Sequence, residues 1–172
     1  MADIKERMIR AAKLDASLYE EVEADKDALG QAAVVVLLSS VAGGVGSLLH
    51  GGLSGLVLGI VASLIAWYLW AYVTYLVGAK LFPEPQTQAD FGQLLRTTGF
   101  ASTPGLIRVL GIIPGLGGIV FFVALVWMLI AMVVAVRQAL DYNSTLRAAG
   151  VCAIGWLGLA AVLYLLGPGV SR

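Results

Sequence analysis

Arg108 is the residue of this chain that most needs a chemical explanation, because it lies in an otherwise apolar segment. A cation inside a bilayer costs a few kcal/mol or more, so such residues usually have a function. Three uses are open. The side chain can extend to the membrane surface, pair with a carboxylate, or bind a lipid phosphate. No Asp or Glu stands in the surrounding apolar sequence, which keeps a lipid headgroup among these possibilities.

The residues that usually build catalytic and metal sites are few and scattered. His50 is the sole histidine and Cys152 the sole cysteine, and neither belongs to a metal-ligand spacing or a nucleophile-base arrangement. We interpret His50 as a polar residue at a helix end. The glycine-rich run 111–118 lacks the Lys-Ser/Thr pair of a phosphate-binding loop. We therefore expect no enzyme, no metal site and no cofactor.

Composition indicates an integral membrane protein. Of the 172 residues, 59% are hydrophobic and 13% are charged, and the mean hydropathy is +0.89. Such a chain is too apolar for an ordinary soluble domain and has room for one compact bundle of four or five helices. Eleven basic residues balance eleven acidic ones, so nucleic acid is not an expected partner. The expected environment is the lipid bilayer.

The stretch 88–118 is the one long break in this apolar pattern. It contains Pro104, Pro114, Arg108 and several glycines. A continuous lipid-facing helix would lose backbone hydrogen bonds at the prolines, and irregular backbone at membrane depth must be covered by protein. We therefore expect the long apolar helices on both sides to surround this segment.

Residues 1–29 form a polar leader, which we predict to be an interfacial amphipathic helix. At 100° per residue, one face collects Ile4, Met8, Ala11, Leu14, Leu18, Tyr19 and Val22, with Asp15 as the exception on it and Ile9 as the outlier. The early basic residues Lys5, Arg7 and Arg10 are candidate contacts for lipid or a partner, as are Arg96 and Arg108 later in the chain. The leader contains no apolar signal-peptide core, so we expect a cytoplasmic N-terminus.

The remainder, 30–172, is predicted to be a single membrane domain. The expected spans are 31–49, 53–78, 101–115, 118–136 and 148–166, the third being short and broken by Pro and Gly. The first two should form a hairpin with a tight turn at 50–52. Small residues let helices approach closely, and they mark the expected packing surfaces of this hairpin: Gly43, Gly46, Gly55, Gly59 and Ser63.

A second amphipathic helix is expected at 88–100, between the second and third spans. Thr87 is a plausible cap, which places Asp90 at the third helical position in an acidic variant of the capping box. Half of the helix is polar, so we expect it at the membrane interface. It should enter the membrane near Phe100.

The residues 90–106, DFGQLLRTTGFASTPGL, resemble the central signature of bacterial Yip1-type membrane proteins. The resemblance rests on an Arg-x-x-Gly-Phe motif that leads to a small-residue-Pro step, and its positions here are Phe91, Arg96, Gly99, Phe100 and Pro104. The leader residues 14–25 are similar to leaders of the same group. The resemblance implies a five-helix domain with a cytoplasmic N-terminus. Eukaryotic relatives are associated with Rab GTPases and vesicle traffic, and they carry a longer cytosolic region than this chain.

Basic residues do not decide between five crossings and a re-entrant broken segment, because each topology places four of six inside. The resemblance favours five. For function we expect a non-catalytic scaffold or adaptor that organises a membrane protein partner or lipid, or that associates with itself. The alternative is a small permeation or lipid-handling protein with a cavity around the broken third span and Arg108.

Overall fold

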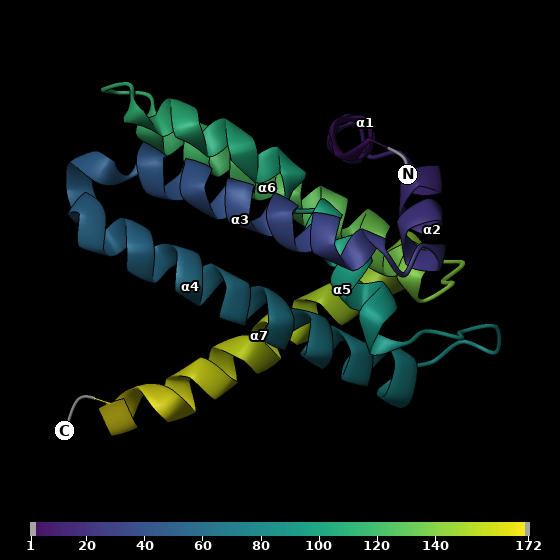
Figure 1. Ribbon diagram of the computed structural model, residues 1–172. Coiled ribbons are helices and arrows are strands. Elements are labelled where there is room, and N and C mark those ends of the chain that lie inside the picture. The colour runs from purple at the N-terminus through teal and green to yellow at the C-terminus, as the bar shows by residue number, and fades with distance from the viewer. Residues whose placement is uncertain (1–2, 171–172) are drawn as a thin grey trace.

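The protein is a bundle of helices of very different lengths (Figure 1). The computed structural model describes the backbone of residues 3–170 and the side chains of 3–47 and 56–161. The α-helices are α1 (Ile4–Ala12), α2 (Ala16–Ala24), α3 (Ala28–Gly46), α4 (Leu48–Tyr75), α5 (Phe91–Phe100), α6 (Gly117–Ala139) and α7 (Thr145–Val170). A π-helical segment, η1 (Leu76–Leu81), extends α4, and a 3-10 helix, η2 (Thr103–Ile112), follows α5. The described backbone contains no strand, which confirms the all-helical class.

Three helical stretches of the described residues are long and apolar enough to cross a membrane. They are Ala28–Gly46, Leu56–Leu81 and Gly117–Ala139. The described side chains of α7 cover a shorter apolar helix, Thr145–Ala161. The expected third span, 101–115, contains only the ten-residue 3-10 helix η2, which is shorter than a span. The chain is thus an integral membrane protein, and three of the expected spans meet this criterion within the described residues; the expected fifth span, 148–166, extends beyond the described side chains.

The first hairpin turns earlier than predicted. α3 ends at Gly46, Ser47 follows, and α4 begins at Leu48, so residues 50–52 are helical instead of forming the turn. Glycines and a serine at the end of α3 allow this close connection without a loop. The predictions for the side chain of His50 and for packing at Gly55 lie outside the described side chains.

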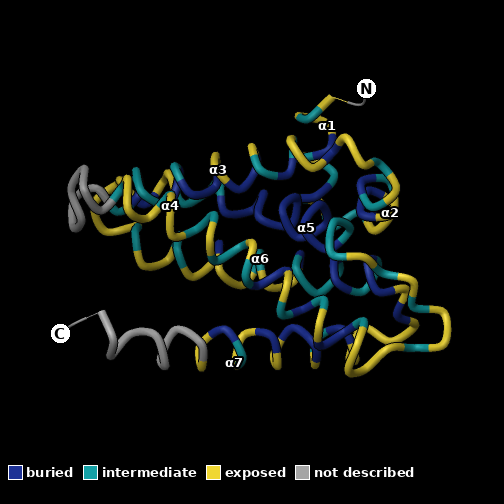
Figure 2. The backbone as a smooth tube through the Cα atoms, turned by 60° about the horizontal axis from the view of Figure 1, so that its bottom comes forward, coloured by how far each residue is buried: buried dark blue, intermediate teal, exposed yellow. Residues whose placement is uncertain are grey.

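The short helix α5 lies inside the bundle, so its polar residues are buried instead of exposed as expected for an interfacial helix at 88–100; its position relative to the membrane interface stays a prediction. It is in contact with α2, α3, α4 and α6, and residues 94–100 are all buried, as the dark blue turns labelled α5 in Figure 2 show. The helix starts at Phe91, because Asp90 rather than Thr87 is its cap. The Thr87 hydroxyl instead donates to the Leu140 carbonyl at 2.8 Å.

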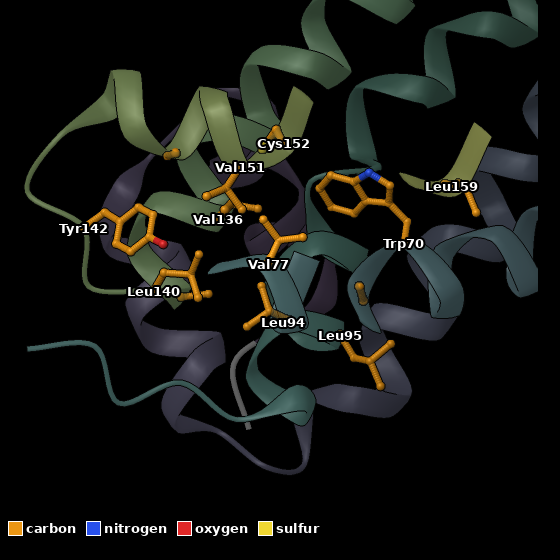
Figure 3. Close-up of a cluster of buried hydrophobic side chains, with 13 residues drawn as sticks. Trp70, Val77, Leu94, Leu95, Val136, Leu140, Tyr142, Val151, Cys152 and Leu159 are labelled. Atoms are coloured by element: carbon orange, nitrogen blue, oxygen red, sulfur yellow. The ribbon is translucent and has the colours of Figure 1, made fainter. Parts of the chain in front are cut away.

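Two apolar clusters meet at α5. One joins η1, α6 and α7 and includes Leu94, Leu95 and Trp70 (Figure 3). The other joins the N-terminal helices to α3 and α6 and includes Phe100 and Tyr19. Because α5 contributes side chains to both clusters, it couples the N-terminal part of the chain to the C-terminal helices.

After α5 the chain continues as ten residues of 3-10 helix, which is long for this conformation. Pro104 stands in the first turn of η2, where its missing N–H is not needed. The helix packs against both α3 and α6. The first turn of η2 is buried against these helices, as expected for the broken stretch, while Val109, Leu110 and Ile112 are 40 to 50% exposed.

The leader folds into two helices instead of the single predicted one, because the chain reverses at Leu14, whose φ is 61°. Asp15 then caps α2, its carboxylate accepting from the Ser17 N–H at 3.0 Å. The predicted apolar face exists, and Leu18, Tyr19 and Val22 are fully buried. They pack against residues of α3, α5 and α6, so this face contacts protein and not lipid. We call α1 and α2 together the cap.

Candidate functional site

The Arg108 guanidinium is held by neutral acceptors. Its Nε donates to the Gly105 carbonyl at 3.0 Å. Its Nη2 donates to the carbonyl and to the hydroxyl of Ser39, at 2.8 and 2.9 Å. Among the side chains that the structure describes, none is a hydrogen-bond partner of Nη1 and none forms an ion pair with Arg108. The arginine thus keeps unused donors and an unbalanced positive charge.

Three glycines make room for Arg108. A Cβ at Gly43 would lie 3.1 Å from the guanidinium carbon, and one at Gly105 would lie 3.0 Å from Nη2. A Cβ at Gly46 would collide with the Arg108 carbonyl. We call the space bounded by these glycines and Ser39 the Arg108 cradle. A Cβ at Gly105 would also collide with the Ser39 hydroxyl, so side chains at these positions would disturb the arginine or its partner.

The side chain points into the bundle. The Arg108 backbone lies against Gly46, the last residue of α3, while its guanidinium reaches Ser39, seven residues or about 10 Å back along that helix. The side chain therefore runs toward the cap and away from the nearer end of α3. Of the uses expected for Arg108, pairing with a carboxylate is not found among the described residues, while extension to a membrane surface and contact with a lipid phosphate stay predictions.

A groove of about 420 Å³ lies beside the cradle, and among the described residues that line it Arg108 is the one that is charged. The remaining walls come from α6 and from one residue of α7: Phe121, Phe122, Leu125, Met128, Leu129, Met132 and Trp156. Phe122 is 66% exposed and Trp156 46% exposed, so the groove is open to the surroundings of the bundle. The apolar walls of the groove therefore lie next to the positive charge of Arg108.

The two ends of the cap are joined by charge. Arg7 is 4% exposed; its Nε lies 2.9 Å from Glu21 Oε1 and its Nη2 2.7 Å from Asp25 Oδ2. Arg10 pairs with Asp15 and, at 2.5 Å, with the second oxygen of Glu21. Bonds from Arg10 and Arg7 hold the pKa of Glu21 below its usual value. Arg7 and Arg10, expected to contact lipid or a partner, are thus used inside the cap, while Lys5 is exposed.

Arg96 fixes the cap to the core. Its guanidinium donates to the Val22 carbonyl at 2.9 Å and to the Glu23 carbonyl. These carbonyls belong to the last turn of α2, where they have no partner within the helix and where the helix dipole favours a cation. Arg96 is 6% exposed, so it acts between α5 and α2 and not as a surface contact.

Glu23 is the titratable group of the cap with the most unusual environment. Burial, followed by the charge of Asp141, raises the pKa of Glu23 to about 7, against an opposing effect of Arg96. The carboxyl is half-buried where the cap meets α5 and the α6–α7 turn. Its charge therefore changes near neutral pH.

The remaining residues of the Yip1-like motif hold α5 in place. The Phe91 ring meets the rings of Tyr68 and Tyr72 edge to face, with centroids 5.1 and 5.6 Å apart. A Cβ at Gly99 would lie 2.7 Å from that of Ala32 on α3. Phe100 is fully buried. Each of these contacts needs the small or aromatic residue that occupies the position.

The expected match between two ridges of small residues differs from the structure. Gly43 and Gly46 face Arg108, as described above, and Gly44 is the glycine of α3 that lies against Leu56 of α4. Gly59 is exposed and has nothing within 4 Å of a Cβ position, while Ser63 is half-buried. η2 occupies the surface of α3 that was assigned to α4, because Arg108 requires the glycines there.

Ser39 is the functional residue that the sequence analysis missed. No local pattern singled it out, because its contact with Arg108 joins positions 69 apart in sequence. The ion pairs between α1 and α2, in contrast, could have been predicted from the sequence. Opposite charges precede and follow Leu14 and Asp15, and an Asp-x-Ser cap in the middle of a helical pattern indicates two helices.

These features define a class of protein: a helical integral membrane protein with a broken central segment enclosed by longer helices and by a docked N-terminal cap. The Yip1 domain matches residues 16–167, and the chain belongs to the Yip1 family. Comparisons with curated proteins and with solved structures gave no match.

Proposed function

We propose that this Yip1-family protein is a non-catalytic membrane scaffold that presents its cap to a membrane protein partner on the cytoplasmic side. The observation that carries the proposal is the fastening of the cap. Arg96 binds the end of α2, Arg7 and Arg10 join α1 to α2, and Trp127 of α6 donates to the Ala12 carbonyl at 2.9 Å. A surface held at several points loses little freedom on binding.

The topology that goes with this proposal has five crossings and a cytoplasmic N-terminus. Ten residues of α-helix in α5 rise about 15 Å. Ten residues of 3-10 helix in η2 rise about 20 Å. Placed end to end they would extend about 35 Å, which is enough to cross a hydrocarbon layer of about 30 Å. α5 and η2 can therefore act as one crossing, with α3, α4, α6 and α7 as the others.

The exposed face of α1 is the surface that we assign to the partner. Lys5, Ile9 and Lys13 are spaced four residues apart and all three are exposed, Ile9 at 56%. On a helix this spacing forms one stripe. An apolar side chain between two cations suits a partner surface that offers an apolar contact flanked by carboxylates.

The test is purification in nanodiscs followed by mass spectrometry of the retained proteins, with a photo-crosslinking side chain at Ile9. We expect a stoichiometric membrane protein that crosslinks at this position. The combined variant Lys5→Glu, Ile9→Ser and Lys13→Glu should lose it while keeping its melting temperature. The charge reversal Lys26→Glu, in the exposed α2–α3 turn, serves as the control and should retain the partner.

Two results would overturn the proposal. In one, the protein is recovered alone. In the other, the same protein is retained by the wild type and by the stripe variant with no crosslink at Ile9. If the crosslinked protein is a second copy of this chain, the chain associates with itself and not with a different protein.

A further inference from the structure

A positive charge in the membrane-embedded part of this protein has no carboxylate to balance it. All eleven Asp and Glu residues of the chain fall within 3–27, within 84–90 or at 141, and none is in α3, η2 or α6. The acceptors around Arg108 are two carbonyls and one hydroxyl. These dipoles fix the direction of the guanidinium but carry no net charge. In a medium of low dielectric constant, such a cation attracts an anion strongly.

The arrangement of donors leaves a place for that anion. Nε and Nη2 are bonded to Gly105 and Ser39, whereas Nη1 has no partner among the described side chains. Gly43 and Gly105 approach the guanidinium so closely that a methyl group at either would press on it. The cradle therefore holds one edge of the guanidinium and leaves donors free on the other.

The groove beside the cradle decides what kind of anion fits. Arg108 is its charged lining residue, and the walls next to it are the apolar side chains of α6, with Trp156 of α7 opposite. A volume of about 420 Å³ lies in the range of sites that bind small molecules. A small hydrated anion would gain nothing from these walls. An anion that carries a hydrocarbon chain would satisfy both parts of the site.

We propose that the groove between α6 and α7 binds one anionic phospholipid, whose phosphate accepts from Arg108 Nη1 and whose acyl chain lies along Leu125, Met128 and Trp156. With Nε and Nη2 already bonded, Nη1 is the donor left for the phosphate, and a hydrogen bond between two charged groups is stronger than a neutral one. The exposed fractions of Phe122 and Trp156 show that a chain can enter from the side of the bundle. The site is separate from the cap and does not depend on the partner proposed for it.

The test uses the full chain in nanodiscs of phosphatidylcholine with a small fraction of phosphatidylglycerol, followed by release into native mass spectrometry. The wild type is expected to retain one phosphatidylglycerol in preference to phosphatidylcholine. Arg108→Gln should weaken that retention about tenfold or more, the factor that corresponds to one lost charged hydrogen bond. Arg108→Lys keeps the positive charge but has fewer N–H donors. Its retention of phosphatidylglycerol should lie between that of the wild type and that of Arg108→Gln.

A second variant tests the groove without changing the cradle, so that misfolding at Arg108 cannot explain a loss of lipid. Leu125 is 51% exposed on α6, so Leu125→Trp fills the groove while leaving Arg108 and its partners in place. It should lose the lipid and keep the wild-type melting temperature. Arg147→Gln, at an exposed cation near the start of α7, is the charge-matched control and should retain the lipid.

Fluorescence locates the acyl chain. Phosphatidylglycerol brominated on its chains should quench tryptophan emission more than brominated phosphatidylcholine does, and Trp156→Phe should remove this difference. Equal retention of both lipids by the wild type and by Arg108→Gln would overturn the proposal. Specific retention of oleate without phosphatidylglycerol would also overturn it, since the anion would then be a carboxylate. If Leu125→Trp binds the lipid as well as the wild type does, the lipid does not lie in this groove, and the proposal is wrong.

Discussion

Arg7, Arg96 and Arg108 each join different parts of this protein through hydrogen bonds from the guanidinium. Arg7 has carboxylates of α2, Arg96 has the last carbonyls of the same helix, and Arg108 has a serine and a glycine carbonyl. A guanidinium can serve all three because its five N–H donors are fixed in one plane. Arg7 and Arg96 therefore act as structural connections, while Arg108 keeps capacity for a ligand.

At the same scale, Glu23 makes the stability of the cap depend on pH. Burial raises the pKa of Glu23 to about 7 in the folded state, above the ordinary 4.5. Its stabilising contribution is complete below pH 4.5 and is lost as the pH rises through 7, because the charged carboxylate is the unfavourable form. We expect Glu23→Gln to raise stability at pH 8 by about 1 kcal/mol, a value reduced for partial solvent exposure.

The measurement is the melting temperature of both proteins between pH 5 and pH 8. The gain from Glu23→Gln should shrink toward pH 5, where Glu23 is already protonated in the wild type. Glu20→Gln is a control, since it changes an exposed carboxylate of the same helix. A gain that is the same at both pH values would show that the effect comes from packing and not from titration.

At the scale of elements, the start of α5 is set by a reciprocal cap. The Gln93 N–H donates to Asp90 Oδ1 at 2.8 Å, and the Gln93 side chain accepts from the Asp90 N–H. We expect Asp90→Ala to lower the free energy of unfolding by about 1 kcal/mol. Asp90→Asn should keep most of it, because the amide oxygen also accepts. Denaturant unfolding in detergent measures the difference, and an equal loss in both variants would assign the effect to charge instead.

The broken crossing shows what local sequence can and cannot predict about an element. Pro104 and the surrounding glycines predicted an interruption, since neither supports a continuous helix. The depth of α5 was not predictable in the same way. Its polar residues Arg96, Thr97 and Thr98 suggested an interface, yet all three are buried. Arg96 bonds to α2, and the two threonines donate to carbonyls one turn earlier in α5.

At the scale of the whole molecule, composition predicted the class, and the Yip1-like residues predicted the family. The apolar face of the leader was predicted residue by residue, but what it covers was not. Hydrophobic periodicity identifies which side of a helix is buried and says nothing about whether protein or lipid covers it. Here the answer depends on contacts such as Arg96 with Val22, 74 positions apart.

The cap is a fixed part of the fold, docked on the bundle. A distance measurement tests this claim most directly. In a Cys152→Ala background, spin labels at Lys13 and Asn143, both exposed, report the separation of the cap from the α6–α7 turn. We expect one narrow distance distribution that does not change between neutral and anionic nanodiscs. A broad distribution, or one that shifts with anionic lipid, would show that the leader lies on the membrane surface and would contradict the docked cap.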